Sequence, residues 1–342
     1  MKKSVKTALS IGFILLVIGM ALVAVALARG ASFQELWNNG SLSVSLISTG
    51  FGDLDGYTVC STGAESFSSD EVRRIDLGWV SGSVRLEPGG DCLTLKESCS
   101  RPLKEEQKLC WKLEKGTLFV RFCTAVRTQN LEKDLVLTFP AGWSAENITV
   151  DASSANISLR ELNIKKALAV SATSGDLHLE SCRCDSLDAG TTSGSADLQG
   201  CEARLLTLGA TSGGLRAEGC RCESLEADTT SGSIYVRSEA TSIELGSTSG
   251  AIRCEDVPAL CDVSIETTSG SVKLSLRGTG NHQRIAVDTT SGDVYLDVPG
   301  AIDLDFDTAS GKLSGRLEQG GSGCPSVEID TTSGNLILGA FD

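Results

Sequence analysis

The stretch Asp228–Ser238, "DTTSGSIYVRS", decides the fold, because near-copies of its centre recur to the C-terminus as TTSG, ATSG, STSG or TASG. Their Ser-Gly pairs return about every 20 residues, a period typical of a solenoid, in which each coil buries its apolar face by stacking on its neighbours. The pairs, which we expect at the corners of the coils, are Ser174 and Gly175, Ser193 and Gly194, Ser212 and Gly213, Ser231 and Gly232, Ser249 and Gly250, Ser269 and Gly270, Ser291 and Gly292, Ser310 and Gly311, and Ser333 and Gly334.

Apolar residues stand at fixed distances from each glycine. Around Gly270 they are Val263, Ile265 and Val272, that is, seven and five residues before it and two after it. Alternation of this kind predicts two β-strands per coil, each with one face in the core. The alternation shifts by one residue at the Ser-Gly pair, which indicates a corner. We expect glycine there because the corner needs a backbone conformation that a Cβ resists, and serine because its hydroxyl can bond unpaired backbone groups or the next coil's hydroxyl.

Two earlier copies, "RIDLGWVSGSVRL" around Gly82 and "NITVDASSANISL" around Ala155, raise the total to about eleven coils of roughly 20 residues, the last ten contiguous. The sequence therefore predicts an all-β, parallel, β-helix-like solenoid. Between these copies, "CWKLEKGTLFVRFC" predicts a hairpin that turns at Lys115–Gly116, and the next strand should end before Pro140. This region should cap the stack, since an open end invites aggregation.

The N-terminus predicts one transmembrane helix. Three lysines precede the uncharged run at residues 8–28, which as a helix of about 1.5 Å per residue is long enough to cross a bilayer. The lysines place the N-terminus in the cytoplasm and the remainder outside the cell membrane. A cleaved signal peptide is the alternative, since "ALA" ends the run. The expected organisation is a stub and anchor at 1–30, a tether at 31–70, the first coil and cap at 71–147, and repeats at 148–342.

The exported part is strongly acidic. Beyond residue 30 the chain has 26 basic and 44 acidic residues, a formal net charge of −18. Such a surface repels nucleic acid and attracts divalent cations or cationic peptides. Four residues before the glycine, on the outward face, the last four coils carry a column of carboxylates: Glu266, Asp288, Asp307 and Asp330. Calcium, the one candidate cofactor, would relieve their repulsion; the alternative is a hydrated acidic face.

Some of the thirteen cysteines form a second column. Cys182, Cys201 and Cys220 each stand seven residues after a corner glycine, and Cys184 and Cys222 follow two residues later. In an exported protein stacked cysteines are expected to form disulfides. Buried free thiols and a thiolate metal site remain alternatives. The odd number leaves at least one thiol unpaired within the chain.

The repeated serines are not predicted to be catalytic. A nucleophilic serine needs a neighbouring base, and the two histidines, His178 and His282, stand at non-equivalent places in their coils. The alternative class is a carbohydrate-active enzyme on a β-helix scaffold, which would need a groove with converging acidic and basic side chains. The connections between coils are too short and uniform to build one. A non-catalytic binding protein is therefore expected.

The combination of an apolar N-terminal helix, the "WVSGSVRLEPGG" strand pair, the "KGTLFVRF" hairpin and the Thr-Ser-Gly coils resembles the bacterial putative-adhesin β-strand-repeat family, a domain of unknown function, over about residues 70–342. The resemblance implies a solenoid outside a bacterial membrane, associated with adhesion or envelope stress, and supplies no catalytic residues. The many cysteines depart from it. The expected partners are the membrane, through the helix, and an envelope glycan, protein or cationic peptide.

Overall fold

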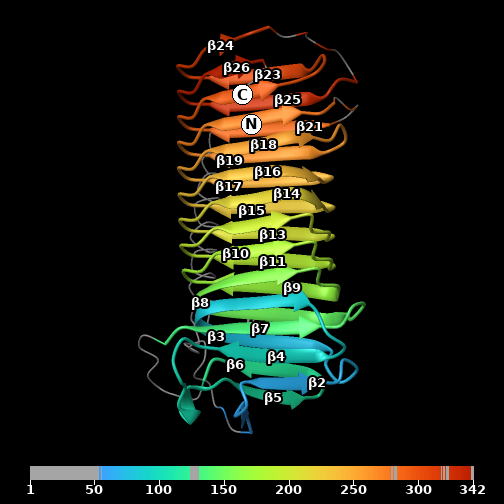
Figure 1. Ribbon diagram of the computed structural model, residues 1–342. Helices are drawn as coiled ribbons and strands as arrows, with labels where there is room; N and C mark the ends of the chain where they lie inside the picture. Colours follow the sequence, from blue (N-terminus) through green and yellow to red (C-terminus); the bar gives the residue numbers. More distant parts are fainter. Residues whose placement is uncertain are drawn as a thin grey trace. The chain divides into compact units, whose positions relative to one another are not determined.

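The computed structural model describes residues 54, 56–123, 131–278, 280, 283–316, 318, 320 and 323–339. In these residues every regular element is a β-strand, apart from a 3-10 turn at Glu105–Gln107 (Figure 1). None of them belongs to a helix long and apolar enough to span a membrane. The predicted transmembrane helix, most of the tether and His282 lie outside the described residues. The chain divides into two compact units. The first ends at Ser195 and the second begins at Ala196.

The first unit combines an antiparallel cap with parallel turns. Its strands are β1 (Thr58–Val59), β2 (Ala64–Phe67), β3 (Arg74–Pro88), β4 (Leu93–Ser98), β5 (Cys110–Glu114), β6 (Thr117–Arg121), β7 (Lys133–Phe139), β8 (Ala145–Arg160), β9 (Ile164–Ala172), β10 (Leu177–Glu180) and β11 (Ser186–Thr191). β4 runs antiparallel between β2 and β7, and β5 antiparallel between β1 and β6. β7 and β6 both pair in parallel with β3 and so join the cap to the turns.

The hairpin and the strand end predicted in the cap are both confirmed. Lys115 and Gly116 connect β5 to β6 with φ angles of 50° and 77°. Two consecutive positive φ angles are typical of the tight turn whose twist matches that of a hairpin. β7 ends at Phe139, directly before Pro140, which has no backbone N–H to continue a ladder.

The predicted number of coils is wrong. Nine Ser-Gly corners each separate two short strands, but the copies around Gly82 and Ala155 are single long strands, β3 and β8. These two strands stay paired in parallel from Arg74 opposite Asn147 to Leu86 opposite Leu159, with the two corner residues opposite each other. Because the ladder continues through the corner, neither copy divides into two strands. The solenoid therefore has about nine turns rather than eleven.

The second unit consists of two parallel sheets. Its strands are β12 (Ala196–Gln199), β13 (Leu205–Ala210), β14 (Leu215–Arg221), β15 (Ser224–Thr229), β16 (Ile234–Glu239), β17 (Ser242–Ser247), β18 (Ile252–Val257), β19 (Asp262–Thr267), β20 (Val272–Leu276), β21 (Arg284–Thr289), β22 (Val294–Asp297), β23 (Asp303–Thr308), β24 (Leu313–Ser314), β25 (Ser326–Thr331) and β26 (Leu336–Leu338). One sheet has the order β13-β15-β17-β19-β21-β25-β23, and the other β12-β14-β16-β18-β20-β22-β26-β24.

The last two turns are exchanged in space, so the turns do not stack in sequence order at this end. β25 and β26 pair with β21 and β22, while β23 and β24, which come earlier in the sequence, lie outside them (Figure 1, red end). The inner turn fills the core with Val327, Ile329 and Leu336, all fully buried. The outer turn has Gly315 opposite the apolar Leu338 and fills the core less completely. Burial of apolar surface therefore favours the observed order.

The predicted core columns are confirmed. Leu206 and Ile265, which represent the columns seven and five residues before the glycine, are almost completely buried. In each parallel pair, a core residue lies directly opposite its equivalent in the next turn, as Ile265 does with Leu245 and Val287. Each turn thus shares its apolar contacts with two neighbours. The alternate residues of each strand face outward and form the surface.

Candidate binding surface

The corners are held by a hydroxyl that the sequence reasoning missed. The backbone N–H of Gly232 donates to Oγ1 of Thr229 at 3.1 Å, and that of Gly270 donates to Oγ1 of Thr267 at the same distance. The equivalent acceptors three residues before the glycine are Thr191, Ser247, Thr289, Thr308 and Thr331. In the sequence, this recurring hydroxyl residue is the first threonine of TTSG. Apart from the part-buried Thr308, these residues are buried, and their hydroxyls satisfy a buried donor.

The predicted serines are exposed, and several of them form hydrogen bonds to the backbone from the outside. Oγ of Ser249 donates to the carbonyl oxygen of Thr230 at 3.4 Å. Oγ of Ser269 donates to the carbonyl oxygen of Thr248 at 3.3 Å. Each bond joins one turn to its neighbour. Ser291, Ser310 and Ser333 donate in the same way, so these five serines bond backbone carbonyls of a neighbouring turn.

The corner glycines are needed for a different reason from the one predicted. Among the predicted corner residues only Gly82 has a positive φ, 101°, so the expectation of a special backbone conformation is wrong for the nine repeats. A Cβ built on Gly270 would instead overlap the carbonyl oxygen of Gly250, and one on Gly292 would overlap that of Gly270. Stacked corners approach too closely for any side chain, which is another situation that requires glycine.

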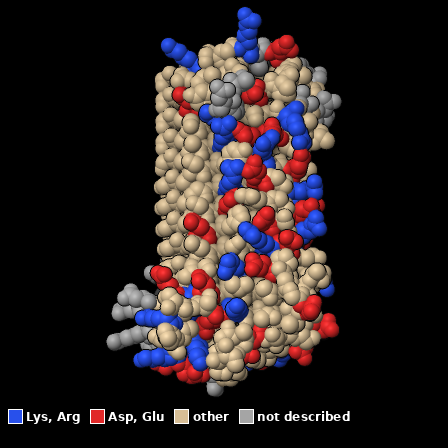
Figure 2. Space-filling view, viewed as in Figure 1, with Lys and Arg blue, Asp and Glu red and all other residues tan. Residues whose placement is uncertain are grey.

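Charge is distributed unequally over the second unit. On one sheet, the outward side chains of β15, β17, β19, β21 and β25 form what we call the acidic face, and its charged residues are Glu226, Asp228, Glu244, Asp262, Glu266, Asp288, Glu328, Asp330 and Arg284. On the other sheet, β14, β16, β18, β20 and β22 carry five basic and five acidic residues. Figure 2 shows acidic and basic side chains gathered beside a strip of surface without charged residues.

The outward side chains of β14, β16, β18, β20 and β22, which we call the mixed face, pair their charges locally. The guanidinium of Arg216 lies 4.4 Å from the ring centroid of Tyr235 and also contacts the carboxylate of Glu218. Arg237 lies 2.6 Å from the carboxylate of Asp256. Because each cation has an acidic or aromatic neighbour, this face offers little net charge to a partner.

Three residues of the predicted carboxylate column, Glu266, Asp288 and Asp330, lie on the acidic face, and the fourth, Asp307, lies beside them on β23. Their order differs from the predicted one. Glu266 is opposite Asp288, Asp288 is opposite Asp330, and Asp330 is opposite Asp307, because the last two turns are exchanged. Burial and the repulsion of Asp288 and Glu244 raise the pKa of Glu266 above its ordinary value. The neighbouring carboxylates of Asp288 and Glu244 thus disfavour ionisation of Glu266.

Asp228 extends this column toward β15. It is buried, and its backbone position is opposite Gly246, which in turn is opposite Glu266. Burial first, then the charges of Glu226, Glu244 and Glu266, raise the pKa of Asp228 to about 7. A calcium ion would relieve this repulsion, but no three His, Cys, Asp or Glu side chains in the described ranges are arranged to hold a metal. Calcium binding stays a prediction.

The predicted cysteine column is buried. Cys182, Cys201 and Cys220 are completely buried, and Cys184 and Cys222 are partly so. Sγ of Cys220 lies 3.7 Å from the carbonyl oxygen of Leu198, and burial raises the pKa of Cys222 to about 12. The structure, which describes all thirteen cysteines, joins none of them in a disulfide. The role of this column stays a prediction.

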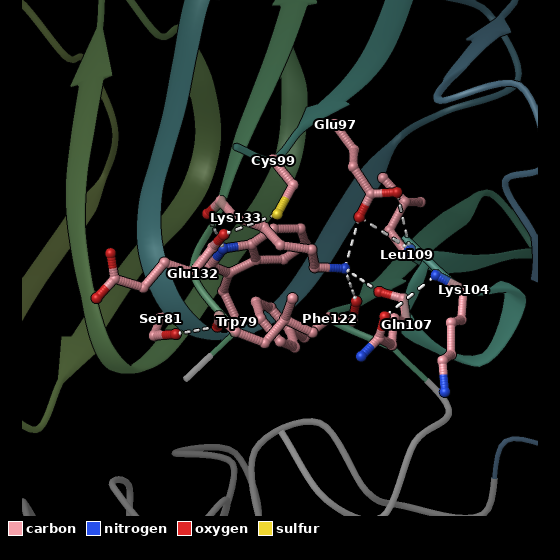
Figure 3. A network of polar contacts seen from close by, with 11 residues as sticks. Trp79, Ser81, Glu97, Cys99, Lys104, Gln107, Leu109, Phe122, Glu132 and Lys133 are labelled. Atoms are coloured by element: carbon pink, nitrogen blue, oxygen red, sulfur yellow. Dashed lines mark hydrogen bonds and ion pairs between the residues drawn. The ribbon is translucent and has the colours of Figure 1, made fainter. Parts of the chain in front are cut away.

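A buried ion pair in the cap has no counterpart in the sequence analysis. Nζ of Lys133 lies 2.5 Å from Oε2 of Glu97 and also donates to the carbonyl oxygens of Gln107 and Phe122 (Figure 3). Both oxygens of Glu97 accept the backbone N–H of Leu109, at 3.0 and 3.1 Å. Burial lowers the pKa of Lys133, and Glu97 opposes that shift. All polar atoms of the pair are thus satisfied without solvent, which fits a structural role.

The outer surface of the first unit contains a small hollow lined by Thr149, Asp151, Ser171 and Asp188, among others. Its volume of about 30 Å³ holds about two water molecules. Oγ of Ser171 donates to Oδ1 of Asp151 at 2.5 Å, and burial raises the pKa of that carboxyl to about 6. A sugar ring does not fit into this hollow.

Comparisons with known proteins give one family and several similar solved structures. No curated protein matches the sequence. Three similar solved structures are a putative adhesin from Parabacteroides merdae (13% identity, 81% of this chain and 95% of that chain covered, TM-score 0.42), a putative lipid binding protein from Parabacteroides distasonis (14%, 82% and 98%, 0.42) and a putative adhesin from Bacteroides fragilis (12%, 80% and 95%, 0.35). The family model described as Toastrack DUF4097 matches residues 115–338, more than half of the chain. This chain therefore belongs to the Toastrack DUF4097 family.

Proposed function

We propose that the protein is a non-catalytic, adhesin-like component of the cell envelope. In this proposal the N-terminal apolar segment holds it in the membrane, and the solenoid outside binds a cationic partner, a peptide or protein segment rich in lysine and arginine. The observation that carries the proposal is the acidic face, where eight carboxylates are accompanied by a single arginine. An extended array of one sign attracts a partner of the other sign and increases its rate of encounter.

The pKa values on this face support a cationic partner. Asp228 and Glu266 have raised pKa values, partly because neighbouring carboxylates repel one another. A bound cation would reduce that repulsion, so binding and ionisation of the face should favour each other. Protons should therefore be released when such a partner binds near neutral pH.

A carbohydrate-active enzyme has less support. Such an enzyme needs a cleft in which carboxylates meet the substrate, whereas the hollow beside Asp151 has room for only about two water molecules. The carboxylates of the acidic face stand on the flat outer surface of consecutive strands. A flat array suits an extended binding interface better than a reaction at one bond.

The test compares two variants of the full chain that change the net charge equally. Glu244→Gln/Glu266→Gln/Asp288→Asn removes three carboxylates from the acidic face, and Glu218→Gln/Glu255→Gln/Asp297→Asn removes three from the mixed face. Binding of a fluorescent oligolysine is measured by anisotropy at several salt concentrations. The acidic-face variant should weaken binding at least about tenfold and reduce its salt dependence, and the mixed-face variant should change little. Equal losses would show that net charge alone governs binding, which contradicts the proposal.

The proposed location has a separate test. Protease added to intact cells should remove the solenoid while a tag on the N-terminus stays protected, because the lysines before the apolar segment keep that end in the cytoplasm. Protection of both ends would contradict the location without affecting the binding result.

A further inference from the structure

The outer edge of the second unit is formed by β23 and β24. In the described residues, β23 pairs only with β25 and β24 only with β26, so one side of each strand has no strand partner (Figure 1). The backbone N–H and C=O groups on that side are available to another strand. An edge of this kind is a template for strand addition unless its side chains prevent it.

The core is open at this edge. Leu304 and Phe306, which occupy columns that are buried in the preceding turns, are partly exposed. Leu313 is 49% exposed, whereas its equivalents Leu336 and Val294 are completely buried. Covering these three side chains with apolar groups would remove their apolar surface from water, which is favourable. Within the described part of the chain, β23 and β24 therefore have no covering layer of apolar side chains, and the segment at Glu318 and Gly320 bonds only Ile302, directly before β23.

The charge on β23 selects what can cover it. Asp303, Asp305 and Asp307 alternate with the core positions and are exposed. A second copy that paired edge to edge would bring two sets of three carboxylates to neighbouring strands, and like charges at that distance destabilise the pair. The same aspartates would attract lysine or arginine. The edge thus disfavours a copy of itself and favours a basic strand.

We infer that the edge of β23 binds a β-strand of a partner protein in which apolar residues alternate with lysine or arginine. The added strand would lie about 4.8 Å from β23, with its apolar side chains over Leu304 and Phe306 and its cations opposite the three aspartates. Backbone hydrogen bonds would supply affinity and the alternation would supply specificity. This site is distinct from the acidic face, because it requires a strand conformation and one sheet edge.

The test uses short peptides and the full chain. The probe peptide alternates four lysines with three valines, and the control peptide has the same composition in two blocks, four lysines followed by three valines. Binding is measured by calorimetry, and protection of the β23 amides by hydrogen exchange with mass spectrometry. The alternating peptide should bind at least about tenfold more tightly than the block peptide and should protect β23 but not β15. Equal affinity of the two peptides would overturn the inference, because simple charge attraction ignores the order of residues.

A charge reversal separates the edge from the acidic face. Asp303→Lys/Asp305→Lys/Asp307→Lys should lose affinity for the lysine-valine peptide and gain affinity for a peptide that alternates glutamate with valine. Glu244→Lys/Glu266→Lys/Asp288→Lys changes the net charge equally and should keep the preference for the alternating lysine peptide over the block peptide. The inference is overturned if the acidic-face variant loses this preference while the β23 variant keeps it. If the edge variant does not fold, protection of β23 in the unchanged protein still decides the question.

Discussion

Nζ of Lys133 and Oε2 of Glu97 lie 2.5 Å apart inside the cap, with both side chains removed from solvent. The ammonium group also lies 4.3 Å from the ring centroid of Phe122 and 5.0 Å from that of Trp79. Trp79 Nε1 in turn donates to the backbone carbonyl of Lys133 at 3.0 Å. The pair therefore connects β4, β7 and β3 at the point where the cap meets the parallel strands.

Lys133→Met should destabilise the protein by about 3–5 kcal/mol, because it leaves Glu97 charged and unpaired in the interior. The free energy of unfolding is measured by urea titration monitored by circular dichroism.

Two controls accompany that variant. Lys133→Met/Glu97→Leu should recover part of the loss, since it removes the uncompensated charge. Arg277→Ala breaks the exposed ion pair with Glu239 and should have a much smaller effect. A Lys133→Met variant as stable as the unchanged protein would contradict the structural role of the pair.

The pKa of Asp228, raised to about 7, predicts a pH dependence of stability. The folded state binds this proton more tightly than the unfolded state, whose carboxyl titrates near 3.8. The stabilisation is therefore complete below about pH 4 and is lost as the pH rises through about 7. Asp228→Asn should flatten the decrease in melting temperature between pH 5 and 8, whereas Glu328→Gln should leave it unchanged. The prediction fails if both variants keep the full decrease.

Gly270→Ala should cost about 1–3 kcal/mol or more, because the new methyl group overlaps the carbonyl oxygen of Gly250 in the neighbouring turn. Gly209→Ala is the matched control in the same unit, since a Cβ there meets no atom within 4 Å. It should change stability by less than about 1 kcal/mol, and a gain is expected from the reduced freedom of the unfolded chain. Denaturant unfolding of both variants decides whether close approach is the reason for glycine.

Charges in the core columns should unfold several turns together. Leu206→Asp or Ile265→Asp buries a carboxylate without a partner, and the neighbouring turns lose the same core. Aspartate at Thr211 or Thr230, on the outside of the corners, should have little effect. Hydrogen exchange should show loss of protection in adjacent strands only for the Leu206 and Ile265 variants. Equal protection in all four variants would contradict the assignment of these residues to the core columns.

Calcium should not stabilise the carboxylate column more than sodium does. Screening by either salt reduces repulsion among Glu266, Asp288, Asp330 and Asp307. At equal ionic strength we expect equal melting temperatures. A specific rise with calcium that disappears in Asp288→Asn/Asp307→Asn would instead demonstrate a metal site.

The repeats were predictable because their pattern is local and recurs. Leu206 and Ile265 occupy positions set by two periods, two residues along a strand and about 20 along the chain, and both are buried as expected. Lys133 was not predictable in this way. A lysine at the start of β7 is normally exposed, and its burial depends on Glu97 and on carbonyl groups that are distant in sequence.

The candidate surfaces were predictable only in part. The column of Glu266 and Asp288 follows from the repeat, but its order at the end of the unit depends on which of two turns fills the core better. Gly315, in a position that is apolar in the other turns, was the available signal for the exchange. The reason for the corner glycines could not be predicted, because contact between stacked backbones leaves no pattern in a single sequence.

The exchange of the last two turns has a consequence for synthesis on the ribosome. The growing chain emerges with residues 303–314 ahead of residues 326–338, yet the later residues take the place beside β21. Residues 303–314 must therefore stay unpaired at first, or pair temporarily with β21 and then move outward. Domains generally fold as the chain emerges, so this end of the solenoid reaches its native order only after Leu338 has left the exit tunnel.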